Sequence, residues 1–597
     1  MLLNERDLNF LLYEFLDTQA LLERERYAEH DRAVFDATLA TARQVAADFF
    51  APHNHKADQN EPIFDGERVT LIPETLAAWN AFAEAGFLAA HHDVDDGGLQ
   101  LPEVLLRACM AYFNAANIAT TGYPFLSIGA ANLIKTFASP ALQQRFLPAL
   151  FAGRFSGTMA LTEPGQGSAL GDLRTRAVVA EDGTYRVFGQ KMFISGGDHE
   201  LTENIVHLVL ARIEGAPAGV KGISLFVVPK FNVDADGALG ARNDVALAGL
   251  LHKMGYRNTT STVLSFGEGN GAVGYLVGEA NKGLGYMFQM MNEARIGVGL
   301  GAASLAYQSY LHALDYARER PQGRLSSCKD PLTRQVPIIA HADVRRMLLM
   351  QKAYAEGSLA LCLYASSLVE DAHTGPTAQA RDDAAQLLDL LTPMVKTWPS
   401  RYGLVASDLG IQILGGAGYT REYPLEQLYR DNRLNPIHEG TEGIQALDLL
   451  GRKLGLKGGR GYALFLEQVE HSLAQAERLG ECQALGRHLA KGMTILGEVT
   501  AALQQQVAED ADRGLANATA YLDLFGRVLV GWVWLRQAML GESALSQGAV
   551  GEEADFYRGK LHTARYYLEW ELAPLPGIAH LLCAGNSACH DMQSHWF

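Results

Sequence analysis

The chain has 597 residues, 48% of them hydrophobic and 20% charged, which is the ordinary balance of a water-soluble protein with several domains. Its formal net charge of -17 argues against nucleic acid as a general partner, because phosphate binding depends on Lys and Arg. The six cysteines are too scattered for a disulfide framework, and Cys583, Cys589 and His590 fit no common zinc spacing, so no metal is expected.

The N-terminus and the apolar runs predict where the protein resides. Charged residues interrupt the apolar ones in the first segment, which indicates an amphipathic helix and not a signal peptide. No uncharged apolar run reaches about 18 residues, so no integral membrane segment is expected. We expect a cytoplasmic protein, with peripheral association at the inner membrane left open.

Residues 1–156 predict an N-terminal helical domain. Leu8, Leu12 and Phe15 share one face of the first segment, and similar spacing returns in 34–50 and 74–85.

The apolar spacing changes at Gly157, which begins a predicted middle β-domain, 157–280. Segments 175–180 and 185–190 alternate and flank Asp182-Gly183, a strong hairpin signal. Further strands are predicted at 204–213, 222–228, 245–251 and 260–266.

Helical spacing returns over 281–458, which predicts a helical bundle domain with long helices at 283–320, 338–373 and 378–415. Pro393 and Pro399 should kink or divide the last of these. A fourth piece, 459–597, is again helical and mildly acidic, with 13 Lys and Arg against 16 Asp and Glu counted from Gly451.

The segment Arg433-Leu-Asn-Pro-Ile-His-Glu-Gly-Thr-Glu-Gly-Ile-Gln445 closes the bundle domain. Gly440 permits a tight turn, and Thr441 is a suitable N-cap for the helix that follows. Glu439 therefore lies on a loop just upstream of a helix N-terminus, with its carboxylate not fixed by the turn. Read alone, such a Glu is more often a surface or capping residue, so other segments must decide its role.

Several separated motifs resemble those of the acyl-CoA dehydrogenase family, over about residues 80–455. They are Met159-Ala-Leu-Thr-Glu-Pro-Gly-Gln-Gly-Ser168, Gly189-Gln-Lys-Met-Phe-Ile-Ser-Gly-Gly197, Lys253-Met-Gly255, Arg295-Ile-Gly297, Ala317-Arg-Glu-Arg320, Gln412-Ile-Leu-Gly-Gly-Ala-Gly-Tyr419 and the segment around Glu439. Their order makes the set far more specific than any one motif. The added N-terminal helix and the tail resemble a large-subunit branch that contains bacterial long-chain enzymes and methylthiopropionyl-CoA dehydrogenases.

The resemblance implies a mainly helical fold with a middle β-domain and a four-helix bundle, plus an extra C-terminal helical domain, with FAD between the β-domain and the bundle. The implied FAD-binding residues are Met159, Leu161, Thr162, Phe193, Ser195, Arg320, Gln412, Gly415, Gly416 and Thr441. Small hydroxyls such as Thr162 and Ser195 suit the polar edge of the flavin, while Arg320 suits the FAD pyrophosphate of a neighbouring subunit. Ordinary sheet core is the alternative for the apolar positions, and a solvated charge for Arg320.

The resemblance also implies a reaction, in which a base removes the α-proton of an acyl-CoA thioester while a hydride leaves the β-carbon for the flavin. Glu439 aligns with that base. The implied substrate-binding residues are Ser168, Asn292, Arg295, His438 and Gly440. Desolvation by the bound acyl chain would make the carboxylate a stronger base, and backbone donors would polarise the thioester carbonyl.

Some positions depart from the family pattern. Phe193 stands where many members have Trp, which should loosen the shielding of the flavin edge. His438 replaces a Tyr found in some members and would be expected to influence the pH profile. Gly443 replaces a polar FAD-binding residue, and Gln322-Gly323 lacks the usual aromatic after the Arg.

The leading interpretation is an FAD-dependent acyl-CoA dehydrogenase of fatty-acid β-oxidation, acting on medium or long chains and passing electrons to electron-transferring flavoprotein. Alternatives are a methylthiopropionyl-CoA or other short acyl-CoA dehydrogenase, an acyl-CoA oxidase or flavin monooxygenase, and a DNA-binding alkylation-response member, which the acidic tail disfavours. Small relatives without a tail are commonly tetramers. Because the apolar faces of the tail must bury against the bundle, we expect a homodimer.

Overall fold

The computed structural model describes residues 1–597, the side chain of Gln289 excepted. The chain forms two compact units. Residues 30–297 with Leu2 make the first, here called the sheet unit, and Met1, 3–29 and 298–597 make the second, the bundle unit. Helix α7, Gly283–Glu319, begins in the sheet unit and ends in the bundle unit.

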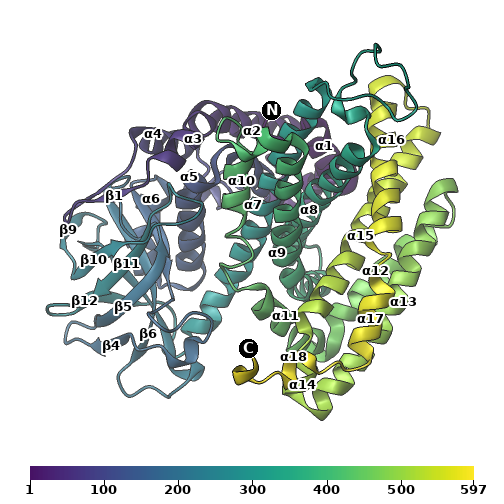
Figure 1. Ribbon diagram of the computed structural model, residues 1–597. Helices are drawn as coiled ribbons and strands as arrows, with labels where there is room; N and C mark the ends of the chain where they lie inside the picture. Colours follow the sequence, from purple (N-terminus) through teal and green to yellow (C-terminus); the bar gives the residue numbers. More distant parts are fainter. The chain divides into compact units, whose positions relative to one another are not determined.

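The sheet unit combines helices with one large sheet (Figure 1). Its helices are α2 (Arg32–Val45), α3 (Asn54–Gln59), α4 (Pro73–Glu84), α5 (Glu103–Phe137) and α6 (Pro140–Phe151). Its strands are β1 (Ile63–Phe64), β2 (Val69–Thr70), β3 (Phe155–Ala160), β4 (Arg176–Val179), β5 (Tyr185–Ser195), β6 (Asn204–Ile213), β7 (Ile223–Pro229), β8 (Phe231–Val233), β9 (Leu239–Arg242), β10 (Val245–Leu250), β11 (Ser261–Phe266) and β12 (Ala272–Leu276).

The main sheet has the order β10-β11-β5-β12-β7-β6-β3, with β4 paired to β5 and β6. Strand β6 is almost continuously apolar because both of its faces are covered. Val206 and Leu208 belong to a core shared with α5 and α6, while Val209 belongs to a second core with Val187 and Phe226. The long helix α5 therefore covers one face of the sheet.

The predicted hairpin and the four further predicted strands are confirmed. Strands β4 and β5 pair antiparallel, and Gly183 has a φ of 78° in the turn between them. Strands β6, β7, β10 and β11 begin and end within one residue of the predicted ranges. Strands β3 and β12 of the main sheet were not predicted, nor were the short strands β1, β2, β8 and β9.

The bundle unit is helical. Its helices are α1 (Glu5–Asn9) and the π-helix Phe10–Phe15, then α8 (Ala342–Thr374), α9 (Ala378–Leu414), α10 (Leu425–Asn432), α11 (Glu442–Gly451), α12 (Arg460–Ala476), α13 (Gly480–Glu509), α14 (Ala511–Leu515), α15 (Ala518–Ser546), α16 (Gly551–Tyr566), α17 (Leu575–Cys583) and α18 (Ala588–Asp591).

Helix α9 runs through Pro393 and Pro399 as one element, so the prolines do not divide it, and a kink at either one stays a prediction. Proline lacks an N–H, and Pro399 therefore leaves the carbonyl of Val395 without its helical donor. Gly299 of α7 lies directly against this carbonyl, since a Cβ at Gly299 would lie 2.2 Å from Val395 O. Close packing of α7 therefore covers the site where the helix would otherwise open.

The tail packs on the bundle as expected (Figure 1). Trp534 of α15 donates from Nε1 to the carbonyl of Ala353 on α8, at 3.1 Å, and Gly526 lets α15 approach Trp398 of α9. Helix α15 meets the length and composition criteria for crossing a membrane, but 78% of its most apolar stretch is buried in the protein.

The first segment of the chain also belongs to the bundle unit. Asp7 is 1% exposed and accepts a hydrogen bond from Tyr307 at 2.9 Å. It forms an ion pair with Lys560 of α16, which in turn pairs with Glu356 of α8 at 2.8 Å. This buried charge cluster therefore joins the N-terminal segment, the bundle and the tail.

Candidate functional site

The loop between α10 and α11 carries the predicted base. Thr441 is the N-cap of α11, as predicted, and its hydroxyl accepts a hydrogen bond from Ile444 N at 3.4 Å. Glu439 lies two residues before this cap. The partial positive charge of the helix N-terminus is therefore close to the loop.

Glu439 has a left-handed backbone, with a φ of 53°, and Gly440 follows with a φ of 90°. This conformation is uncommon for Glu and costs of order 1–3 kcal/mol, so the surroundings must hold it. Gln445 Nε2 donates to the carbonyl of Glu439 at 3.1 Å, and Lys396 Nζ donates to the carbonyl of Gly440 at 2.8 Å. The φ of 90° favours glycine at 440, and a Cβ there would also lie 2.6 Å from Gln445 Nε2, so any other residue would disturb this hydrogen bond.

His438 is tied to the interior of the bundle by amide side chains. Its Nε2 lies 3.1 Å from Asn435 Oδ1, and Asn435 Nδ2 donates to Asn432 Oδ1 at 2.9 Å. Because an amide oxygen can only accept a hydrogen bond, the contact with Asn435 Oδ1 requires that Nε2 of His438 carries the proton. Burial, and secondarily the Lys396 ammonium, lowers the pKa of His438 to about 3. His438 is therefore neutral at ordinary pH in the free protein, and its influence on the pH profile stays a prediction.

Glu442 is the nearest carboxylate to Glu439 in sequence and occupies the first turn of α11. Its Oε1 is buried, and the residue lines a cavity of about 10 Å³ together with Trp398, Tyr402 and Asp523. Asp523 belongs to α15, so this cavity lies where α11 meets the tail. The side chain of Glu442 therefore packs against the tail.

In the sheet unit, hydrogen bonds join the two predicted flavin segments. Met159 is in β3, and Leu161 and Thr162 follow it directly. Met192 N donates to Thr162 O at 3.0 Å, and Thr158 Oγ1 donates to Ser195 O at 2.7 Å. The structure therefore brings together the two segments that were predicted to share one ligand.

Phe193 has an unusual conformation at this junction. Its φ is 59° and its side chain is 62% exposed, although it lies within β5. The register between β5 and β11 shifts here, between Thr262 and Leu264, so Phe193 lies in a β-bulge that turns its ring outward. Bulges of this kind are frequent next to ligand sites. Ser195, two residues on, is also exposed.

A buried ion pair anchors the same junction. Lys191 Nζ lies 2.9 Å from Glu163 Oε1 and also donates to the carbonyl of Leu161 at 2.9 Å. Although burial acts in the opposite direction, the Lys191 ammonium and hydrogen bonds from Thr175 hold the pKa of Glu163 below its usual value. This pair was not predicted, although Lys191 occupies an inward position of an alternating strand.

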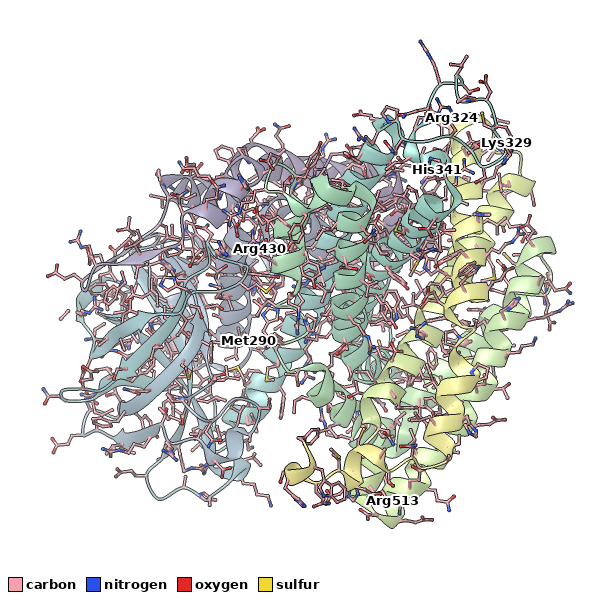
Figure 2. The ribbon with its side chains drawn as sticks, viewed as in Figure 1. Met290, Arg324, Lys329, His341, Arg430 and Arg513 are labelled. Atoms are coloured by element: carbon pink, nitrogen blue, oxygen red, sulfur yellow. The ribbon has the colours of Figure 1, made fainter. Side chains whose placement is uncertain are left out.

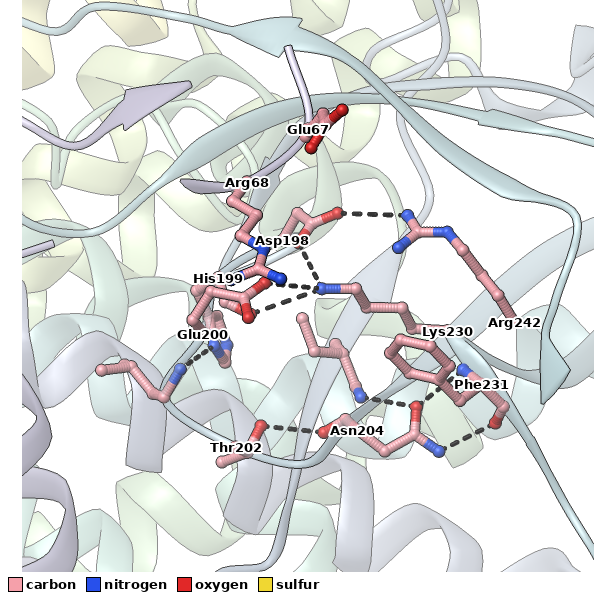
Figure 3. Close-up of polar contacts among 12 residues, drawn as sticks. Glu67, Arg68, Asp198, His199, Glu200, Thr202, Asn204, Lys230, Phe231 and Arg242 are labelled. Atoms are coloured by element: carbon pink, nitrogen blue, oxygen red, sulfur yellow. Dashed lines mark hydrogen bonds and ion pairs between the residues drawn. The ribbon is translucent and has the colours of Figure 1, made fainter. Parts of the chain in front are cut away.

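The chain after Ser195 is held by a second buried lysine (Figure 3). Lys230, which follows β7, lies 2.7 Å from Asp198 Oδ1 and 3.5 Å from both the carbonyl of His199 and Glu200 Oε1. Asn204 fastens the neighbouring backbone by exchanging two 2.9 Å hydrogen bonds with Phe231. The second flavin segment is thus fixed at both ends.

The predicted substrate-binding residues of the sheet unit lie in two places. Ser168 is exposed in the loop after β3. Asn292 and Arg295 lie one turn apart on α7, with Arg295 Nη1 3.5 Å from Asn292 Oδ1. Arg295 is only 3% exposed, so it is not an ordinary surface charge.

The remaining predicted FAD-binding residues are exposed on the bundle unit. Arg320 directly follows α7, and Gln412 lies in the last turn of α9. Gly415 caps α9 with a φ of 61°, and a Cβ at Gly415 or Gly416 would meet nothing within 4 Å. The loop after Arg320 carries Arg324 and Lys329 (Figure 2). These positions leave space for an external group.

The chain matches four family models in sequence. They are described as the acyl-CoA dehydrogenase N-terminal domain, over residues 35–154, the middle domain, over 158–268, and the C-terminal domain, over 281–454. The tail matches a model described as acetyl-CoA dehydrogenase C-terminal like, over 465–593.

Curated proteins and solved structures agree with these matches. The chain is 36% identical to a 3-methylmercaptopropionyl-CoA dehydrogenase of Ruegeria pomeroyi, over 94% of this chain and 95% of the relative. It is 35% identical to a broad-specificity linear acyl-CoA dehydrogenase of Mycobacterium tuberculosis, over 94% of each. The structure of an acyl-CoA dehydrogenase from Bacillus anthracis, complexed with FAD, has the same fold, with a TM-score of 0.74 at 20% identity over 92% of this chain and 88% of that one.

Proposed function

The chain belongs to the acyl-CoA dehydrogenase family, and we propose that it uses FAD to oxidise the Cα–Cβ bond of an acyl-CoA thioester to the trans-2-enoyl-CoA. The observation that carries the proposal is the conformation of Glu439, whose strained left-handed backbone is maintained just upstream of a helix N-terminus. Strain of this kind persists where function requires it.

The residues present fit FAD. In the sheet unit, the joined ends of β3 and β5 offer Thr162 and Ser195 as hydrogen-bond partners, and the exposed ring of Phe193 as an apolar wall. In the bundle unit, Arg320 offers a guanidinium for a pyrophosphate, and Gly415 with Gly416 leaves room for close approach. When bound, FAD supplies the acceptor for the hydride that leaves Cβ.

The chain's own residues carry out the proton chemistry. The carboxylate of Glu439 takes the α-proton, and the backbone N–H of Glu439 donates to the thioester oxygen as negative charge develops there. His438 remains neutral beside this loop, so it adds no competing charge. Asn292 and Arg295 bind the CoA portion, with Ser168.

The acyl group is proposed from the relatives. The two curated proteins above act on a methylthio-substituted propionyl-CoA and on linear acyl-CoAs. We favour linear medium or long chains, within fatty-acid β-oxidation in the cytoplasm, with electrons passing to electron-transferring flavoprotein. Methylthiopropionyl-CoA is the second candidate, because the relative named for it is 36% identical.

The test begins with the purified full chain. Acid extraction should release about one FAD per chain, and anaerobic mixing with saturated acyl-CoAs from C4 to C18 and with methylthiopropionyl-CoA should bleach the flavin. Glu439→Gln should bind the best substrate but lose flavin reduction by at least ~10³-fold, since a general base contributes about 10²–10⁴-fold. The matched control is Glu442→Gln, which should reduce normally.

Two outcomes would contradict the proposal. A colourless protein that cannot be reconstituted with FAD would refute the assignment as a flavoenzyme. A Glu439→Gln variant that still reduces the flavin would refute the assignment of Glu439 as the base. Peroxide released during aerobic turnover would instead indicate the oxidase alternative, which the exposed Phe193 keeps open.

We further propose a homodimer. The tail helices α12, α15 and α16 pack on α8 and α9, so they cover bundle surface that tailless relatives would have free for a second dimer. Trp532 of α15 is 1% exposed and donates to Ser472 Oγ at 2.9 Å, which locks the tail helices to one another.

A further inference from the structure

Lys396 lies inside the bundle without any exposed surface. A buried lysine is unusual, because the charged ammonium loses its hydration. It is on α9 between Pro393 and Pro399, and its Nζ donates to the carbonyl of Gly440 at 2.8 Å. This carbonyl belongs to the residue after Glu439.

Gln445 supports the preceding carbonyl. Its Nε2 donates to Glu439 O at 3.1 Å and lies 3.5 Å from Gly440 O. Gln445 is also fully buried, on the first turns of α11. Two consecutive carbonyls of the left-handed segment are therefore held from two different helices.

We propose that Lys396 and Gln445 form a carbonyl clamp that holds the Glu439–Gly440 backbone in its left-handed form and thereby aims the Glu439 carboxylate and N–H at the substrate. The clamp rests on the function proposed above and assigns positioning residues to the same site. Neither side chain takes part in proton transfer.

The physical reason lies in where the peptide groups point. A change in the backbone torsions of Glu439 and Gly440 that re-aimed the carboxylate would displace the two carbonyls that follow it, and so would break the hydrogen bonds from Gln445 Nε2 and Lys396 Nζ. Losing the bond from Lys396 is costly, because a charged group at zero exposure needs its hydrogen bonds. The buried charge of Lys396 thus lowers the free energy of the left-handed conformation at Glu439 and Gly440 relative to other conformations of the loop.

The test compares Lys396→Met, which keeps an unbranched side chain one atom shorter but removes the charge and the donor, with Lys396→Arg, which keeps both. The matched control is Lys453→Met, which removes another buried bundle lysine, paired with Asp389 at 2.6 Å and not with the loop. For each protein we would measure thermal midpoint, FAD content, the dissociation constant of the best acyl-CoA and the rate of flavin reduction at saturation.

Lys396→Met should reduce the flavin about 10–100-fold more slowly at saturation, the size expected when a reacting group is misplaced, with the dissociation constant changed less than about threefold. Lys396→Arg should recover most of the rate. Lys453→Met should lower the thermal midpoint yet reduce at the wild-type rate. Hydrogen exchange of the amides in 437–441 should rise in Lys396→Met alone.

A Lys396→Met enzyme that reduces at the wild-type rate would overturn the clamp, and so would a loss equal to that of Lys453→Met. If Lys396→Met does not fold, Gln445→Met serves, because it removes the donor to Glu439 O without removing a buried charge, and the Oε1 that is lost with it has no hydrogen-bond partner. A wild-type protein that no acyl-CoA reduces refutes the proposed function instead, while the hydrogen exchange still reports on the clamp.

Discussion

Replacing Lys560 by Met should destabilise the bundle unit more than any surface substitution. Lys560 has no exposed surface and is the cation between two carboxylates, in ion pairs with Asp7 and with Glu356 at 2.8 Å. It also donates to Gln537 Oε1 at 3.0 Å. Without it, the carboxylates of Asp7 and Glu356 face each other in the interior, with Lys352 as the remaining cation.

Removing one partner of a buried ion pair typically costs about 3–5 kcal/mol. The bundle unit has roughly 330 residues, and an unfolding entropy of about 2.1 cal/mol/K per residue gives a fall of about 4–7 °C in its thermal midpoint. Burial is the main cause that raises the pKa of Asp7, and the nearby carboxylate of Glu356 raises it further. Without Lys560 the folded state therefore gains a proton on Asp7 more readily than the unfolded state does.

This proton uptake fixes the sign of the pH dependence. Where the folded state binds more protons than the unfolded state, stability falls as pH rises. The penalty of Lys560→Met should accordingly be larger at pH 8 than at pH 5.5, and Lys560→Met/Asp7→Asn should recover more than half of it.

Differential scanning calorimetry at one scan rate, with hydrogen exchange of Glu5–Phe15, measures the effect. The control is Lys457→Met, whose ion pair with Asp382 is solvent-exposed and should contribute little to stability. Equal shifts for the two variants would refute the reasoning, as would unchanged exchange in the N-terminal segment.

Two further predictions follow from the middle sheet and from the tail. His207 is fully buried in β6, neither ring nitrogen has a hydrogen-bond partner among the described residues, and burial, then Lys230, lowers its pKa to about 3. Because only the unfolded state then binds the proton below about pH 6.5, wild-type stability is lost as pH falls, and His207→Leu should gain about 2 kcal/mol more at pH 5 than at pH 8 in urea unfolding. For the assembly, light scattering should give the mass of two chains; a mass of four would show that the tail does not block the second interface.

The strands and helices were predictable where periodicity is regular. Strand β6 could be predicted because apolar residues on both faces make a short continuous run, and the β4–β5 hairpin because Asp182-Gly183 suits its turn. Strand β3 was missed because Gly157 weakens its pattern, although this glycine is what lets α5 come close: a Cβ there would lie 2.4 Å from that of Ala130. The undivided α9 could not be predicted, because the packing against the Val395 carbonyl comes from Gly299, about a hundred residues away.

The candidate site could be predicted only in part. The Thr441 cap followed from residue type and local spacing, and it is confirmed. The left-handed φ of Glu439 did not follow, because a Glu is a poor choice for that conformation and nothing in the loop itself demands it. The demand comes from Lys396, 43 positions earlier, which reads in the sequence only as a charge within the apolar run Leu390–Trp398.

The buried lysines share one physical origin. Lys191, Lys230, Lys396 and Lys560 are each at most 6% exposed, and each donates to a carbonyl or carboxylate on another element. A buried charge that is compensated by a group far along the chain specifies a contact between distant segments, because misplacing either segment removes that compensation. A lysine within an apolar helix or strand is therefore a signal of long-range structure, and at Lys396 that structure is the backbone of the proposed base.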